Sequence, residues 1–278
     1  MNKTHAIGDA SALDWPGAGP LNQAQAVGAA DDDAAAQEWR VRVDLAACYR
    51  LVELFGWSDL VGTHISARVP GHDHAFLINP FGMTFDEITA TSLIKIDLEG
   101  NVIGESSYYG VNKAGFVIHS AVHQVRDDAN CVMHLHTVDS MAVSALSEGL
   151  LPLNQTAMLT TGDLALHDYE GPALHLDERE RLQRDLGDKH LMLLRNHGTL
   201  AVGASVSEAF VRMFMLQRAC SAQVRTLSMG RPLHEVSAAA RASTEAMGTS
   251  ATTLSRYGQL AWPALLRKLD REMPGYDS

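Results

Sequence analysis

The sequence predicts a single layered α/β domain. Short apolar segments with strand character alternate along the chain with segments of helical periodicity, and no internal repeat or flexible linker separates them. The chain has 278 residues, of which 46% are hydrophobic, and this is enough for a substantial core. Interleaving of this kind is typical of helices that pack on the faces of a sheet.

The net charge and the cysteines narrow the class of protein. The 22 Lys and Arg residues against 33 Asp and Glu residues give a formal charge of −11, which disfavours partners such as nucleic acid or an anionic membrane. Three cysteines in apolar sequence are expected to be reduced core residues. No segment approaches the roughly 20 apolar residues that span a bilayer, and no signal-peptide core is visible. We therefore expect a cytoplasmic protein.

Three regions are expected along the chain. Residues 1–33 are rich in Ala, Gly, Pro and Asp, a composition that cannot bury enough apolar surface to offset the entropy of ordering. We expect a disordered tail or an interface arm there. The folded domain is expected over 34–230, and a C-terminal helical extension over 231–278.

A helix is predicted from about residue 34 to Gly56. Its apolar residues repeat at steps of four, three, four and three, which predicts one buried stripe: Val41, Leu45, Cys48, Val52 and Phe55. Gly56 is a typical residue for the end of a helix. Strand-like segments joined by turn residues then favour antiparallel pairing, at 64–69, 75–78, 93–97 and 102–103.

Helices and strands alternate in the second half. Helices are predicted at 114–125, 139–147, 177–186 and 206–228, with a terminal helix around 260–269. Strands are predicted at 131–136, 191–195 and 200–202. Asp163 and the segment 167–170 lie in turn-like sequence, so we expect them in a solvated loop.

His134 and His136, at the end of the predicted strand 131–136, indicate a metal site. Alternate residues of a strand project from the same face, so the two imidazoles can bind one ion. The candidate for a third ligand is His197, in a turn between two apolar strands. Three histidines with an open fourth position form a catalytic zinc site, in which the metal polarises an oxygen or lowers the pKa of a bound water. A single loop histidine is more often a surface residue, so this assignment depends on the surrounding sequence.

Four segments around these histidines resemble the class II aldolase/adducin family: 62–66, 79–83, 132–137 and 195–203. The resemblance covers about residues 40–230, and segments 111–122 and 223–227 are most similar to the adducin head domain and its bacterial relatives. It implies a three-layer α/β/α sandwich around a mostly antiparallel central sheet. It also implies a homotetramer with active sites between subunits.

The resemblance implies roles for individual residues. His134, His136 and His197 correspond to histidines that hold a divalent metal, usually Zn²⁺, with Mn²⁺ and Fe²⁺ as alternatives. Substrate-binding roles are expected for His64, Asn79, Gly82, Lys113 and His119.

The sequence departs from the sugar-phosphate aldolases of this family beside the metal site. Their Ser-Ser-Glu segment, which supplies phosphate-binding serines and the acid/base Glu, corresponds here to Lys113-Ala114-Gly115. Their phosphate-contacting Asn corresponds to His64. The acid/base is therefore unassigned, because Gly115 stands at its usual position, and His64 and Asp163 are the remaining candidates.

We expect a divalent-metal-dependent carbon–carbon lyase that acts on a small hydroxy, oxo or aromatic carboxylic acid. Both retro-aldol cleavage and decarboxylation are open. Retro-aldol cleavage needs a base to remove a hydroxyl proton, which is the role of the missing Glu, whereas decarboxylation does not. Lys113 suits a carboxylate substrate. Two alternatives are a non-catalytic, adducin-like oligomeric interaction module and an iron(II)-dependent oxygenase that uses the same three histidines.

Overall fold

A seven-stranded sheet forms the centre of the molecule in this computed structural model, which describes residues 34–278 except 72–73, 105–109 and 174. The tail or arm expected at 1–33 lies outside the described residues. The strands are β1 (His64–Arg68), β2 (Ala75–Ile78), β3 (Ile94–Asp97), β4 (Cys131–Leu135), β5 (Leu164–His167), β6 (Leu191–Leu194) and β7 (Gly198–Gly203). Their spatial order is β3-β2-β1-β4-β7-β6-β5.

The sheet is mostly antiparallel, as predicted. Every neighbouring pair runs antiparallel except β5 and β6, which run parallel. The parallel pair requires a crossover, and a helix between the two strands provides it. The predicted strand at 102–103 is reduced to an isolated bridge between Val102 and Ile96.

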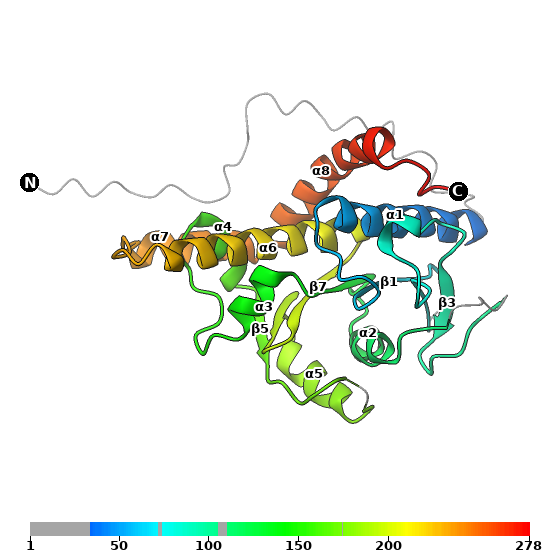
Figure 1. Cartoon of the computed structure of the whole chain (residues 1–278), viewed down its shortest axis with the longest axis horizontal. Helices are drawn as coiled ribbons and strands as arrows, with labels where there is room; N and C mark the ends of the chain where they lie inside the picture. Colours follow the sequence, from blue (N-terminus) through cyan, green and yellow to red (C-terminus); the bar gives the residue numbers. More distant parts are fainter. Residues whose placement is uncertain (1–33, 72–73, 105–109, 174) are drawn as a thin grey trace, which may run out of the picture.

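Helices cover both faces of the sheet (Figure 1). The α-helices of the described residues are α1 (Ala34–Leu54), α2 (Lys113–Val125), α3 (Val138–Ser144), α4 (Gln155–Thr161), α5 (Glu178–Leu186), α6 (Val206–Ser228), α7 (Ala238–Gly248) and α8 (Ala251–Glu272). One core, which includes Leu45 and Cys48 of α1 and Phe210 of α6, packs against one face. A second core, which includes Val117 of α2 and Leu182 of α5, packs against the other. The three-layer α/β/α sandwich is therefore confirmed.

Three elements differ from the sequence prediction. Strand β5 lies between Asp163 and the segment 167–170, which were expected in a solvated loop, and it includes His167. Helix α4 was not predicted, and α7 lies in the predicted helical extension at a position where no individual helix was predicted. Strand β5 has only four residues and is stabilised by pairing with β6, so a long-range contact determines a conformation that its local sequence does not reveal.

Residues 231–278 form α7 and α8, which pack on the domain. Helix α7 packs closely against α4 at Gly248. A Cβ atom on this residue would lie 1.9 Å from the carbonyl oxygen of Leu159, so the close approach requires a glycine. On α8, the Trp262 indole donates a hydrogen bond to the Asp44 carboxylate at 2.9 Å. The division at residue 230 remains a prediction. Among the described residues, no helix is both long and apolar enough to cross a bilayer.

Candidate metal centre

Three histidines converge at the ends of neighbouring interior strands of the sheet. His134 belongs to β4, His136 follows that strand, and His197 lies in the turn between β6 and β7. The Nε2 atom of His136 lies 2.8 Å from Nε2 of His134 and 3.0 Å from Nε2 of His197. His134 is opposite Leu200 in the pairing of β4 with β7, so adjacent strands bring the three rings together.

Hydrogen-bond acceptors orient two of these rings. His134 Nδ1 donates to the backbone carbonyl of Thr199 at 3.0 Å, and His136 Nδ1 donates to the Asp59 carboxylate at 3.0 Å. When both rings are neutral, each has its single N–H on Nδ1 and presents a lone pair at Nε2. Two lone pairs 2.8 Å apart repel each other unless a cation lies between them. The arrangement therefore fits a metal ion bound through Nε2.

Burial keeps His134 and His197 neutral. It lowers the pKa of His134 well below its usual value, and the neighbouring His64 lowers it further. Burial, followed by the proximity of His136, lowers the pKa of His197 to about 4. Because a metal ion binds the neutral imidazole, both groups are in the form that binds a metal at neutral pH.

Sequence reasoning did not identify the two groups that orient the rings. Asp59 is a half-exposed residue of the loop between α1 and β1, and a single loop aspartate shows no recognisable pattern. Thr199 contributes its backbone carbonyl, which is independent of residue type. Only the fold brings these groups to the histidines.

His64 lies beside the centre. The pairing of β1 with β4 places it opposite His134, and their ring centroids are 5.0 Å apart. His64 Nδ1 lies 2.8 Å from Nε2 of His119, a fully buried residue of α2. His119 was expected to bind substrate, but the structure places it behind His64.

The other predicted substrate-binding residues lie on separate elements. Lys113 is the exposed first residue of α2. Asn79 follows β2 and is buried, and its Oδ1 accepts a hydrogen bond from Tyr49 at 2.8 Å. Gly82 adopts a positive φ of 116° in the following turn. Between described residues, no hydrogen bond or ring contact joins Asn79 or Gly82 to the three histidines.

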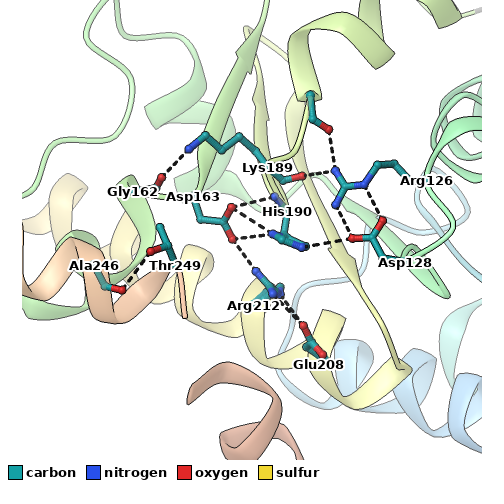
Figure 2. A network of polar contacts seen from close by, with 11 residues as sticks. Arg126, Asp128, Gly162, Asp163, Lys189, His190, Glu208, Arg212, Ala246 and Thr249 are labelled. Carbon is teal, nitrogen blue, oxygen red and sulfur yellow. Dashed lines mark hydrogen bonds and ion pairs between the residues drawn. The ribbon is translucent and has the colours of Figure 1, made fainter. Parts of the chain in front are cut away.

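Asp163 lies at the opposite end of the strands from the three histidines. It precedes β5, which runs parallel to β6, whereas His197 follows the end of β6. Its carboxylate contacts Arg212 at 2.6 Å and His190 at 3.0 Å, and Arg212 contacts Glu208 at 2.8 Å (Figure 2). Burial raises the pKa of Asp163, but the His190 hydrogen bond and the Arg212 charge lower it by more. Asp163 is therefore an ionised member of a buried network, and the structure does not bring it to the metal centre.

A polar cavity that the sequence did not reveal lies beside His197. His167, the last residue of β5, donates from Nδ1 to Asp185 at 2.8 Å, and its Nε2 lies 3.7 Å from the Glu178 carboxylate. His167 and Glu178 line a cavity of about 10 Å³ together with Tyr169 and His197. This volume accommodates one water-sized group.

Residues 43–224 match the family profile described as Class II Aldolase and Adducin N-terminal domain. The chain belongs to the class II aldolase/adducin family. The matched range includes all seven strands and the three converging histidines. Class II aldolases depend on a divalent metal, so the histidine group agrees with family membership.

Two relatives and one solved structure illustrate the range of this family. An aldolase class 2-type protein of Caulobacter vibrioides is 58% identical over 86% of this chain and 92% of its own length. Alpha-adducin of Mus musculus is 44% identical over 83% of this chain and 33% of its own length, so the chain spans about a third of that protein. The structure of L-fuculose 1-phosphate aldolase from Glaciozyma antarctica is 26% identical, covers 90% of this chain and 98% of that chain, and has a TM-score of 0.74.

Proposed function

We propose that this class II aldolase/adducin family member is a divalent-metal-dependent carbon–carbon lyase. Its substrate would be a small hydroxy, oxo or aromatic carboxylic acid, cleaved by decarboxylation or by a retro-aldol reaction. The observation that supports the proposal is the convergence of the Nε2 atoms of His134, His136 and His197. A metal ion bound there would polarise a substrate oxygen and stabilise the negative charge that develops on it. Three imidazole ligands suit Zn²⁺ best, with Mn²⁺ and Fe²⁺ as alternatives.

The residues around the centre would bind and orient the substrate. Lys113 is exposed at the first turn of α2, two residues before Gly115, and Gly115 lies against the His64 ring. An ammonium group there can hold the carboxylate of the substrate while the bond to the adjacent carbon breaks. His64 is our candidate for the acid/base, since Gly115 has no side chain and Asp163 lies at the opposite end of the strands, paired with Arg212.

We also propose a homotetramer with active sites between subunits. Exposed apolar side chains lie close to the metal ligands: Leu60 next to Asp59, Val138 two residues after His136, and Tyr169 with its ring 6.4 Å from His197. A second subunit that covered these side chains would remove apolar surface from water and close the site.

A screen of the metal-loaded protein tests the lyase proposal. Hydroxy, oxo and aromatic acids are incubated with the protein, and carbon dioxide and aldehyde release are followed, with the metal-free protein as control. We expect metal-dependent release of one of these products. A protein that holds stoichiometric metal but cleaves none of these acids would contradict the proposal and favour an adducin-like interaction module, which the 44% identity to alpha-adducin supports as the second candidate.

Replacement of Lys113 tests the carboxylate role. We expect Lys113→Ala to weaken binding of a carboxylate substrate by about tenfold, because a hydrogen bond to a charged group contributes about 1.5 kcal/mol or more. Binding of a neutral analogue should change little. Lys268→Ala, which removes an exposed lysine of α8, is the matched control. Equal weakening of both ligands by Lys113→Ala would exclude this residue from carboxylate recognition.

A further inference from the structure

A buried series of hydrogen bonds leads from the protein interior to His64. His64 Nδ1 lies 2.8 Å from His119 Nε2, and His119 Nδ1 lies 2.5 Å from the Ser66 hydroxyl. The same hydroxyl lies 2.8 Å from His123 Nε2, and His123 Nδ1 lies 3.0 Å from the carbonyl oxygen of Ala129. Strand β1 supplies His64 and Ser66, and α2 supplies the other two histidines.

The carbonyl at the inner end determines the direction of this series. The Ala129 oxygen can only accept, so His123 has its proton on Nδ1 and a lone pair on Nε2. The Ser66 hydroxyl must then donate to His123, which leaves its oxygen to accept from His119 Nδ1. His119 Nε2 is consequently an acceptor, and His64 Nδ1 must donate to it. Each step follows from the previous one.

This deduction requires neutral rings, and burial provides them. It lowers the pKa of His119 well below its usual value and that of His123 to about 3, because neither charged ring is solvated. The His64 ring is buried as well, with 2% of the residue exposed. Each imidazole therefore has one N–H at neutral pH.

Gly115 creates the space that the His64 ring occupies. A Cβ atom on Gly115 would lie 2.6 Å from Cδ2, 2.8 Å from Cγ and 2.9 Å from Nε2 of His64. The ring thus fills the volume next to residue 115, where the resemblance to sugar-phosphate aldolases places a glutamate side chain. The hydrogen bond that His64 makes to His119 uses Nδ1 and leaves Nε2 on the other side of the ring, next to residue 115.

We infer that His64 in the resting protein presents an unprotonated Nε2, a hydrogen-bond acceptor, beside the three-histidine group, and that His119, Ser66 and His123 are positioning residues that maintain this tautomer. The acceptor would take a hydrogen bond from a hydroxyl group of the substrate, at the place where the aldolases use a carboxylate. This inference rests on the proposed lyase function for its role in turnover. The tautomer itself does not depend on that function.

Nitrogen-15 NMR of the zinc-loaded protein tests the tautomers directly. Long-range proton–nitrogen spectra distinguish a protonated ring nitrogen from one with a lone pair. We expect Nδ1 protonation and a lone pair on Nε2 in His64, His119 and His123. Protonation of Nε2 in any of the three rings would overturn the inference.

A variant tests whether the series maintains the tautomer of His64. His119→Phe keeps a buried ring but removes the acceptor of His64 Nδ1, so we expect part of the His64 population to become protonated on Nε2. With a substrate from the lyase screen, kcat should fall by about 10- to 100-fold while KM and the metal content stay the same. His234→Phe, in an exposed segment, is the control and should change nothing.

The outcomes separate this inference from the lyase proposal. An unchanged His64 tautomer in His119→Phe would overturn the positioning role. If His119→Phe does not fold, Ser66→Ala interrupts the same series with a smaller change, and the same two results decide. The expected tautomers in a protein that cleaves no acid would support the inference while the lyase proposal fails.

Discussion

The substitution His136→Ala should abolish stoichiometric metal binding. His136 Nε2 is the atom nearest to both other rings, at 2.8 Å and 3.0 Å, so its removal leaves two ligands. We expect the affinity for zinc to fall by more than about 100-fold, which exceeds the usual cost of losing a group that only orients a ligand. Metal analysis after dialysis against a buffered zinc concentration measures this effect.

Two further variants make the result specific to the metal ligands. Asp59→Asn removes the charged acceptor of His136 Nδ1 but leaves all three ligands, so we expect a smaller loss of about 10- to 100-fold. His234→Ala removes an exposed histidine and should have no effect. One metal per chain in His136→Ala, at the affinity of the unchanged protein, would refute the ligand assignment.

Gly115→Ala should destabilise the fold although alanine has the higher helix propensity. The new methyl group would lie 2.6 Å from a His64 ring that its hydrogen bond to His119 holds in place. Overpacking of this kind costs about 1–3 kcal/mol. In a His64→Ala background the ring atoms are gone, so the same substitution should be close to neutral or stabilising. Urea unfolding of the four proteins of this cycle measures a coupling of about 1–3 kcal/mol.

Gly110→Ala is the matched control for this cycle. A Cβ atom on Gly110 would meet no atom within 4 Å, so this substitution should show no coupling to His64→Ala. Additive effects of Gly115→Ala and His64→Ala would show that the ring can move aside at no cost. With the expected coupling, the aldolase glutamate cannot be restored by Gly115→Glu alone, because His64 must change as well.

The parts of the fold that depend on local periodicity could be predicted from the sequence. The stripe that contains Leu45, Cys48 and Val52 predicts α1, and the structure buries all three residues. The alternation around His134 predicts β4 and the side on which its ligands project. Both signals extend over enough residues to be recognised without tertiary information. The four-residue strand β5 depends on its pairing with β6 and was therefore missed.

The candidate site could be predicted only in part, because several of its properties arise from contacts that are remote in sequence. The position of His119 behind His64 depends on how α2 packs on β1, across 55 residues of sequence. The ion pair of Asp163 with Arg212 spans 49 residues of sequence. The sequence alone therefore left Asp163 as a candidate acid/base, because it did not show that an arginine neutralises this carboxylate. Spacing therefore revealed the ligand residues, but not the groups that orient or neutralise them.

The crowding of lone pairs at the metal centre links folding to metal uptake. Folding holds the Nε2 atoms of His134 and His136 2.8 Å apart, and two lone pairs at this distance repel each other in the absence of a cation. Because burial lowers the pKa of His134 and His197, protons compete poorly for these nitrogens near neutral pH. A divalent ion bound between these nitrogens would remove the repulsion. Because the ion would bind the folded state and not the unfolded one, it would also stabilise the fold. We therefore expect the lifetime of the folded protein to depend on metal supply.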